Sequence, residues 1–242
     1  MLKPKVIVVT PVLNGEQTIK DCLESVKMQD YPFVEHLCVD GNSSDGTLDI
    51  ITKSGVKYIS GQDAGIYDAF SKGVIAADGD IIHILNADDF YASKNIVSSA
   101  VDFMQKHELD LCHGYIEQID VKGKSIRRVG CIQDKKALLS KMRVAHPSVF
   151  VKKSVYNKYG VFSVGFKVAG DHEFLLRVWD KVAVGFLPIV FVKMRLGGAS
   201  NSQVDLSYRE SMAAAILHGR SPLRGVIRFY WETIKNRWLM RQ

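Results

Sequence analysis

The stretch IIHILNADDF, which runs from Ile81 to Phe90, has the pattern that decides the fold. It is an apolar run typical of a buried strand, and it ends in Asn86 and two adjacent carboxylates, Asp88 and Asp89. Adjacent carboxylates repel each other when buried, so they are tolerated when solvated, protonated or neutralised by a divalent cation. The pattern indicates either a Mg²⁺ or Mn²⁺ site of hard oxygen donors, or a solvated turn in which an aspartate caps a helix from Ser93.

Strands and helices alternate on either side of this stretch. Val6–Thr10 and His36–Asp40 have the apolar character of buried strands. Apolar residues at helical spacing predict one helix between Ile19 and Val26 and another between Ile66 and Ala77. This alternation is typical of an α/β fold with a mainly parallel central sheet flanked by helices.

The second half of the chain is less regular. The elements predicted there are a helix near residues 93–106, strands near 109–119 and 125–132, and a helix that begins at Gly170 or Asp171. The sequence shows no internal repeat and no linker. We therefore expect one main domain over residues 1–204 and a helical extension over residues 205–242.

The composition indicates a folded protein of a reducing compartment. Of the 242 residues, 47% are hydrophobic, which is enough for a full core and argues against disorder. The four cysteines are too widely separated for a zinc site or a disulfide framework, so a cytoplasmic location is expected. The N-terminal apolar run is too short for a signal peptide. The stretch Val182–Val192, broken by Gly185 and Pro188, falls short of the roughly 20 residues that span a bilayer.

Polar residues gather at the carboxyl ends of the predicted strands, where ligands bind in open α/β sheets. They form four clusters: Thr10–Asn14, Asp40–Thr47, Gln62–Asp68 and Asn86–Asp89. The second cluster has Thr47 where a phosphate-binding P-loop requires lysine, and the chain has no GxGxxG dinucleotide fingerprint. Turn-forming residues dominate that cluster, so it is either a polar turn that caps the next helix or part of a crevice shared by all four.

Five motifs, in this order, resemble those of family 2 glycosyltransferases. They are TPVLN at residues 10–14, VDGNSSDGT at 39–47, DAGIYDAFSKG at 63–73, GDIIHILNADD at 79–89 and AGDHEFLLRV at 169–178. Together they cover roughly the first 200 residues, and an ordered set is more specific than any single motif. The resemblance implies a GT-A nucleotide-sugar-binding fold for the main domain, a nucleotide-sugar donor that is often a UDP-sugar, a divalent metal (Mn or Mg) and inversion at the anomeric carbon.

The resemblance also implies roles for individual residues at the donor site. Five residues would contact the nucleotide, with Asp40 at the uracil or its ribose: Thr10, Pro11, Asn14, Asp40 and Asp63. Asn86, Asp88 and Asp89 occupy the acidic metal motif, and Asp88 is the expected metal ligand. Asn86 stands where an aspartate is commoner. The asparagine can still form a hydrogen bond to ribose, but it removes one negative charge. This puts metal affinity in question.

Asp171 resembles the catalytic base of the family. A base at this position would take the proton of the acceptor hydroxyl while the bond between sugar and nucleotide breaks on the opposite face. The residues alone favour a helix N-cap after Gly170, with Phe174 and Leu175 in the buried stripe, and the resemblance favours the base. Both interpretations place Asp171 at the start of a helix.

Three further side chains have a functional and an ordinary interpretation. His146 resembles a histidine found ahead of the base motif, which would approach the acceptor or the diphosphate, or it is a packing residue. Arg195 precedes LGGAS and would meet the diphosphate, or it is an ordinary loop arginine. Arg177 is expected on a solvated helix face, with Asp180 as an i,i+3 partner.

The basic tail is the remaining feature. Residues 219–242 contain six basic residues and one acidic residue, while the formal charge of the whole chain is +6. From Pro222 a helix would place apolar and aromatic residues on one face, beside Arg224 and Arg228. Such a helix either contacts an anionic membrane peripherally or packs on the main domain. A nucleic-acid partner is not expected, because no binding motif accompanies the charge.

The sequence thus predicts a cytoplasmic, metal-dependent, inverting hexosyl- or N-acetylhexosaminyltransferase, with the tail as a candidate contact with the inner face of the cell membrane. The acceptor would be a glycan or a lipid-linked glycan of a surface polysaccharide such as lipopolysaccharide. A non-catalytic nucleotide-sugar-binding relative stays open because of Asn86. A nucleotidyltransferase would be expected to show a glycine-rich basic loop after the first strand, which TPVLNGEQ lacks.

Overall fold

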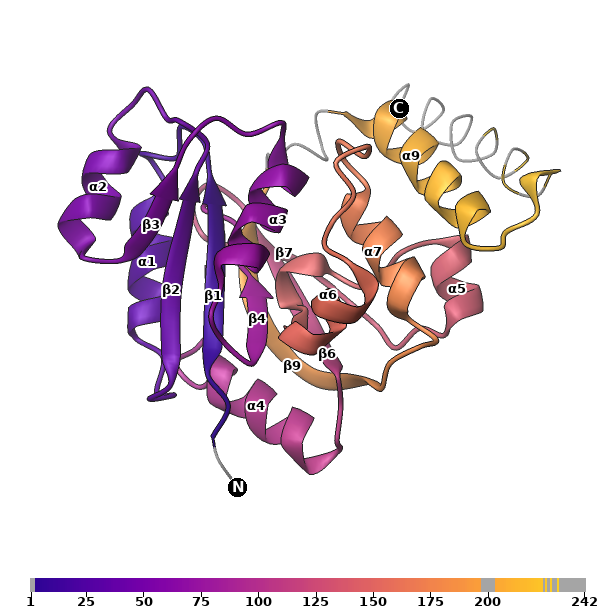
Figure 1. Cartoon of the computed structure of the whole chain (residues 1–242), viewed down its shortest axis with the longest axis horizontal. Coiled ribbons are helices and arrows are strands. Elements are labelled where there is room, and N and C mark those ends of the chain that lie inside the picture. The colour runs from indigo at the N-terminus through magenta and orange to yellow at the C-terminus, as the bar shows by residue number, and fades with distance from the viewer. Residues whose placement is uncertain (1–2, 197–202, 224, 226, 228–229, 231–242) are drawn as a thin grey trace.

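One mixed sheet forms the centre of the protein in the computed structural model, which describes residues 3–196, 203–223, 225, 227 and 230 (Figure 1). The strands in the described part are β1 (Val6–Val12), β2 (Val34–Asp40), β3 (Lys57–Ser60), β4 (Ile81–Ile84), β5 (Phe90–Tyr91), β6 (Leu111–Ile119), β7 (Ser125–Val129), β8 (Phe150–Lys152) and β9 (Val184–Arg195). Their order is β3-β2-β1-β4-β8-β6-β9-β5, and β7 pairs with β6.

Helices cover both faces of this sheet. In the described residues they are α1 (Ile19–Lys27), α2 (Thr47–Ser54), α3 (Ile66–Ala76), α4 (Ile96–Lys106), α5 (Lys135–Ser140), α6 (Lys153–Tyr159), α7 (Gly170–Val178) and α9 (Val204–Leu217), with a 3₁₀ turn, η1, at His146–Ser148. Side chains alternate across a strand, so Val9 of β1 packs in the core cluster of α3 and α7, whereas Val8 packs in that of α1 and α4. The expected helix-flanked α/β architecture is confirmed.

The first half of the sheet is parallel, as the alternation of strands and helices predicted. β1 pairs in parallel with β2 and with β4, and β2 pairs in parallel with β3. All seven residues of β1 are buried, which is the pattern of a parallel strand covered on both faces. The carboxyl ends of β1, β2 and β4 therefore lie at one edge, where three of the four predicted polar clusters begin.

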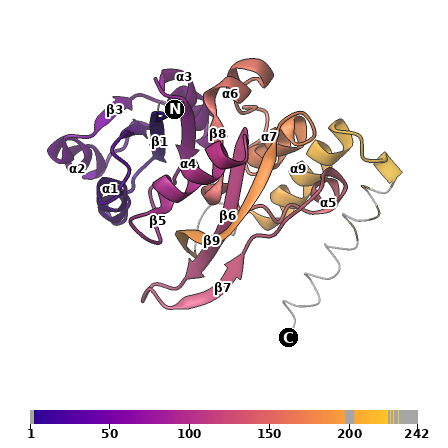
Figure 2. The same ribbon diagram turned by 90° about the horizontal axis from the view of Figure 1, so that it is seen from below.

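The second half of the sheet is mixed, and its longest strand escaped the sequence analysis. β8 is antiparallel to β4 and β6, whereas β6 and β9 run side by side in parallel (Figure 2). The stretch that Gly185 and Pro188 interrupt is part of β9. The register of β6 and β9 shifts between His113 and Ile116, so the segment around Pro188 bulges away from the ladder. A proline, which has no N–H, is tolerated in such a bulge.

Helix α3 lies against β1 and β2 at very short range. A Cβ atom on Gly73 would fall 2.2 Å from Cγ1 of Val9 and 3.0 Å from Cγ2 of Val39. Only a residue without a side chain fits there. This contact fixes the position of α3, whose first turn reaches the polar edge of the sheet.

Helix α9 packs against α7 in the described part of the predicted extension. Glu210 of α9 accepts hydrogen bonds from three consecutive backbone N–H groups, those of Lys167, Val168 and Ala169, at 2.8–2.9 Å. Beyond it, His218 lies 3.0 Å from Glu173 of α7. The domain boundary at residue 204 remains a prediction, but α9 up to Leu217 is joined to α7.

Most of the predicted amphipathic tail lies outside the described residues. These are the basic residues Arg224, Arg228, Lys235, Arg237 and Arg241 and the apolar residues Val226, Ile234 and Trp238. Leu223 and Ile227 are described, and both are exposed. Within the described ranges, none of the helices combines the length and apolarity needed to cross a bilayer.

Candidate active site

A cavity of about 400 Å³ opens at the carboxyl ends of β1 and β4. Its wall contains the predicted site residues Pro11, Asn14, Asn86, Asp88, Asp89 and Arg195, together with Gly15 and Ile66. Four parts of the chain that are distant in sequence therefore converge on it. The cavity joins the first and last of the four polar clusters.

The second polar cluster is tied to the loop after β1. Asn14 has a left-handed backbone, with φ of 53°, and its Oδ1 accepts the N–H of Ser44 at 2.8 Å. The N–H of Asn14 donates to Oγ of Ser43 at 2.9 Å, and that of Gly15 donates to Oγ1 of Thr47 at 2.8 Å. A helix does begin at Thr47, so the cluster is both a helix-leading turn and one wall of the site.

Asp40 and Asp63 flank this wall. Asp40 is almost fully buried and accepts hydrogen bonds from Oγ of Ser60 at 2.6 Å and from the N–H of Ser43 at 3.2 Å. A Cβ on Gly41 would lie 2.5 Å from Oδ2 of Asp63, so the two loops touch. All four predicted polar clusters therefore meet at one edge of the sheet.

Thr10 takes a different position. Its side chain is fully buried, and its hydroxyl lies 2.8 Å from Nε2 of His36. It therefore points into the interior of the protein, away from the cavity. The expectation that Thr10 contacts the donor is not supported by this position, because a side chain of β1 alternates in direction with that of Pro11.

The two adjacent carboxylates differ in exposure. Asp88 is half-buried in the cavity wall, and burial raises its pKa. Asp89 is fully buried; burial first, and then the charge of Asp88, raises its pKa well above the usual range. Oδ2 of Asp89 accepts the side-chain N–H of Asn86 at 3.2 Å. Its Oδ1 and the Oδ1 of Asn86 are buried without a hydrogen-bond partner.

This oxygen-rich corner fits a divalent cation. Two carboxyls with raised pKa values and two unsatisfied oxygens form a site that a positive charge would stabilise. The described residues contain no group of three or more acidic, histidine or cysteine side chains that would hold a metal by themselves. Mg²⁺ and Mn²⁺ sites that share their ligands with substrate phosphates need only one or two protein carboxylates.

Arg195 is the last residue of β9 and reaches the same corner. Its guanidinium donates to the backbone oxygen of Asp88 at 2.9 Å, forms an ion pair with Asp21 and lies over the ring of Phe90 at 5.0 Å. Arg195 thus lies at the end of a strand and not in a loop, and its contact with a diphosphate stays a prediction. Its positive charge lies beside the carboxylates.

Asp171 lies in the first turn of α7. Its Oδ1 accepts the hydroxyl of Tyr67 at 3.0 Å and the N–H of His172 at 2.9 Å. The N-cap residue is Ala169, so the alternative role of Asp171 as the cap is not what the structure contains. Its carboxylate faces a second cavity, of about 300 Å³, between α7 and α9.

Two consecutive residues at the start of α3 connect the walls of the two cavities. Ile66 lines the first cavity, and the next residue, Tyr67, contacts the aspartate that lines the second. Tyr67 was not singled out in the sequence, although it stands inside the motif DAGIYDAFSKG. A tyrosine in an otherwise apolar helix face was the available signal, because a buried hydroxyl requires a hydrogen-bond partner.

His146 packs beneath Asp171. Its ring stacks on Phe70, with the ring centres 5.3 Å apart, and meets Phe162 edge-on at 5.7 Å. Burial lowers its pKa, and the charge of Asp171 opposes that effect. The contacts of His146 are thus those of a packing residue.

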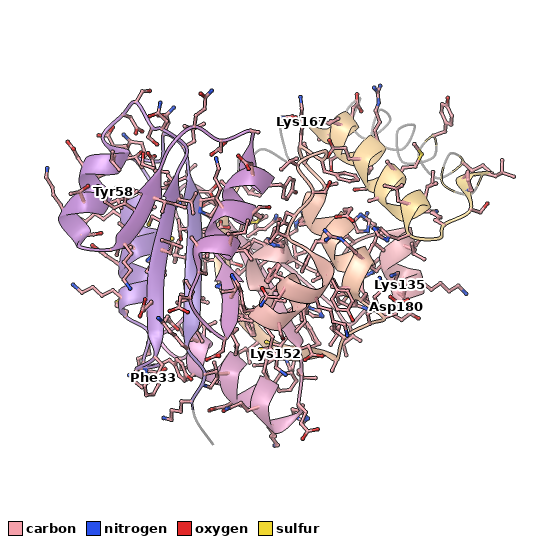
Figure 3. The ribbon with its side chains drawn as sticks, in the orientation of Figure 1. Phe33, Tyr58, Lys135, Lys152, Lys167 and Asp180 are labelled. Atoms are coloured by element: carbon pink, nitrogen blue, oxygen red, sulfur yellow. The ribbon has the colours of Figure 1, made fainter. Side chains whose placement is uncertain are left out.

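Arg177 was misplaced by the sequence analysis. It is largely buried, and it pairs with Glu173 at 2.8 Å and donates to the backbone oxygen of Val161 at 2.9 Å. Asp180 pairs instead with Lys135, at 3.0 Å (Figure 3). The i,i+4 spacing of Glu173 and Arg177 on one helix face accounts for the preferred pair.

The family model for glycosyl transferase family 2 matches residues 7–170, more than half of the chain. The chain belongs to glycosyl transferase family 2. The matched segment includes every residue of the donor-side cavity except those of β9, and it ends one residue before Asp171. The family match therefore does not include Asp171, and the contact of Asp171 with Tyr67 is known from the structure.

Similar proteins agree with membership of family 2. A PGL/p-HBAD biosynthesis glycosyltransferase of Mycobacterium tuberculosis (strain ATCC 25177 / H37Ra) is 26% identical over 251 residues, which cover all of this chain and 96% of that protein. An uncharacterized glycosyltransferase of Mycobacterium tuberculosis (strain ATCC 25618 / H37Rv) is 28% identical over 92% of this chain and 87% of its own length. The protein is a glycosyltransferase.

Solved structures share the fold of this family 2 chain. S. aureus TarS 1-349 in complex with UDP-GlcNAc has a TM-score of 0.72 at 18% identity, over 93% of this chain and 70% of that one. Mannosyltransferase PcManGT of Pyrobaculum calidifontis, in complex with GDP-Man and Mn²⁺, has a TM-score of 0.70 at 17% identity, over 96% and 70%. The chain spans 41% of a longer TarS chain. The expected GT-A fold is confirmed.

Proposed function

We propose that the protein transfers a sugar, with inversion, from a nucleotide-sugar donor bound in the 400 Å³ cavity to an acceptor hydroxyl beside Asp171. The observation that carries this proposal is the link between the two cavity walls through the start of α3. Ile66 and Tyr67 are consecutive, so the donor pocket and the base lie on either side of one helical turn. Inverting transfer by a single displacement requires this juxtaposition.

The donor site divides its tasks among the converging loops. Asp40 accepts hydrogen bonds from the ring or the ribose of the nucleoside, and Pro11, Asn14 and Asp63 shape the cleft around it. Thr10 supports β1 from within and does not touch the donor. Asn86 lines the cavity, and we assign it a hydrogen bond to a ribose hydroxyl. A UDP-sugar is our choice of donor, and hexosyl or N-acetylhexosaminyl is the transferred group.

A divalent metal, Mn²⁺ or Mg²⁺, would bind at Asp88, with the buried Asp89 behind it. When bound, such a metal stabilises the negative charge that develops on the departing diphosphate. Arg195 supplies a fixed positive charge at the same corner, within reach of the backbone of Asp88. The positive charges neutralise two carboxyls whose ionisation burial opposes.

Asp171 acts as the base. The acceptor oxygen forms a bond to the anomeric carbon, its proton passes to Asp171, and the bond from that carbon to the diphosphate oxygen breaks, so that the nucleoside diphosphate leaves. Tyr67 donates a hydrogen bond to Oδ1 of Asp171 and keeps the other oxygen free to face the acceptor. His146 packs below and positions the aromatic cluster around the base.

The acceptor is a glycan or a lipid-linked glycan of the cell surface. Support comes from the relatives whose name assigns them to PGL/p-HBAD biosynthesis and which match over the full length of this chain. We retain a cytoplasmic location, with the basic tail in peripheral contact with anionic lipid at the inner face of the membrane. Loss of liposome binding at high salt would accompany such a contact.

The test combines binding with turnover. A thermal-shift panel of UDP, GDP and CMP, each with MnCl₂ and with EDTA, reports nucleotide binding, because a ligand specific for the folded state raises the melting temperature. We expect a manganese-dependent shift with UDP that Asp88→Ala removes. Asp102→Ala, an exposed aspartate on α4, is the matched control.

Donor hydrolysis then separates an enzyme from a non-catalytic relative. UDP-sugars incubated with the protein should release UDP slowly, with water as the acceptor, and Asp171→Asn should abolish that release while leaving the UDP-induced shift intact. A protein that binds UDP but hydrolyses no donor would favour the non-catalytic alternative. Full hydrolysis by Asp171→Asn would remove Asp171 as the base.

A further inference from the structure

The cavity between α7 and α9 contains more than the proposed base. Asp171 and His172 line it from α7, and Ser207, Ser211 and Met212 line it from α9. Its volume of about 300 Å³ is at the small end of ligand-binding pockets. Its α9 wall lies beyond the segment that matches the family model.

The cavity is built by contacts that hold both helices. Glu210 accepts three backbone N–H groups of residues 167–169, directly before the turn that carries Asp171. At the other end of α9, His218 lies 3.0 Å from Glu173. A carboxylate held in a nest of successive N–H groups is a strong, charge-assisted arrangement. The spacing of α7 and α9 is thus fixed at both ends.

Electric charge is distributed unevenly in this cavity. The carboxylate of Asp171 is on one side of His172, and the guanidinium of Arg220 acts on the same imidazole from elsewhere in the wall. Burial lowers the pKa of His172; Asp171 opposes this effect, and Arg220 adds to it. A negative and a positive group therefore both act on His172.

Two positive side chains line the cavity near the end of α5. Arg220 donates to the backbone oxygen of Leu139 at 2.9 Å, which holds its charge in the cavity wall. Lys141 follows α5, is exposed and lines the same cavity. Asp171 is the one acidic residue in the described lining. An anionic group that enters here meets two cations, while a hydroxyl is directed to Asp171.

We propose that this cavity binds an acceptor sugar that carries a phosphate, with the phosphate against Lys141 and Arg220 and an acceptor hydroxyl at Asp171. The apolar side chains of Met142 and Met212 face the sugar ring or an attached chain. This inference rests on the proposed function, in which Asp171 takes the proton of that hydroxyl. The phosphate belongs either to a soluble glycosyl phosphate or to a lipid-linked one.

The test is isothermal titration of the full chain with three series of probes, in the presence of UDP and MnCl₂. The first series contains the 1-phosphates of glucose, mannose and N-acetylglucosamine, the second their methyl glycosides, and the third their decyl phosphodiesters. We expect at least one 1-phosphate to bind about tenfold or more tighter than its methyl glycoside. Titration measures binding without turnover, so its result does not depend on whether the proposed reaction takes place.

A matched pair of variants tests the residues. Lys141→Glu should abolish the preference for phosphate without changing the UDP-induced thermal shift. Lys136→Glu, an exposed lysine on α5 that does not line the cavity, should keep the preference. Tighter binding of the decyl phosphodiester than of the free 1-phosphate identifies a lipid-linked acceptor; equal binding identifies a soluble one.

The opposite result is equally definite. Equal binding of phosphates and methyl glycosides, no binding of any probe, or a phosphate preference that survives Lys141→Glu would overturn the assignment. If the wild-type chain shows the phosphate preference but does not bind UDP, the result would count against the proposed donor site alone.

Discussion

The hydroxyl of Tyr67 lies 3.0 Å from Oδ1 of Asp171. The same hydroxyl lies 2.9 Å from the backbone oxygen of Val168. A hydroxyl has one proton, so it donates to one of these acceptors at a time. Tyr67 thus joins α3 both to the carboxylate of Asp171 and to the loop that precedes α7.

Tyr67→Phe should therefore slow the reaction. The side chain of Asp171 loses its hydrogen-bond donor from α3, and a hydrogen bond to a charged group contributes about 1.5–3 kcal/mol. We expect donor hydrolysis to fall by about tenfold or more, while the UDP-induced thermal shift stays unchanged. Tyr156→Phe is the control, since Tyr156 stacks on Phe174 in the same cluster. Equal rates for wild type and Tyr67→Phe would contradict this role.

Asp89→Asn should stabilise the protein in EDTA at neutral pH. Burial raises the pKa of Asp89 in the folded state. The protonated carboxyl therefore stabilises the fold at low pH, and this stabilisation is lost as the pH rises through the folded-state pKa. An amide removes this loss, and we expect a melting temperature higher by about 3 °C or more at pH 7.5. The gain should shrink at pH 5, and the manganese-dependent UDP shift should weaken. Asp102→Asn is the exposed control; a variant less stable than wild type at both pH values would refute the argument.

Glu210→Ala should loosen the base loop. Three backbone N–H groups lose a charged acceptor, which costs about 2–3 kcal/mol and lowers the melting temperature by about 4–10 °C. Amide hydrogen exchange at Lys167, Val168 and Ala169 should accelerate, and donor hydrolysis should fall. Arg209→Ala, exposed on the same helix, should leave all three measurements unchanged. Unaltered exchange at these amides in Glu210→Ala would show that the contact does not hold the loop.

Gly73→Ala should destabilise the donor half of the sheet. The added methyl group would lie 2.2 Å from Val9, and overpacking of a core costs about 1–3 kcal/mol. Chemical denaturation measures the loss directly, because the midpoint shifts while the slope stays constant. Gly61→Ala is a matched control, since its Cβ would meet no atom within 4 Å. Equal stability of the two variants would mean that α3 can shift away from β1.

The sequence predicted the donor half well because that half is built from local patterns. β1, β2 and β4 are apolar runs of a few residues, and α1 and α3 show apolar residues at helical spacing within a few turns. The alternation of these strands and helices then predicts a parallel sheet. The carboxyl ends of these strands then bring distant polar clusters together. Pro11, Asn14, Asn86 and Asp88 line one cavity for this reason.

The acceptor half could not be predicted in the same way. β9 was concealed by Pro188, whose fit depends on a register shift opposite Gly114 that no local pattern reveals. The partner of Asp171 is Tyr67, 104 residues away, and the partner of the loop before it is Glu210. Arg177 was misplaced because spacing gives the face of an element but not what covers that face.

The long reach of Glu210 has a consequence for biosynthesis. β1 to β4 are complete by Ile84, whereas Glu210 follows Val168 by 42 residues. A chain emerges from the ribosome N-terminus first, at about 5–20 residues per second. The 42 residues that separate Val168 from Glu210 therefore take about 2–8 seconds to translate. Until then the loop at residues 167–169 lacks the acceptor of its three N–H groups, so α9 must be synthesised before this loop can take its final conformation.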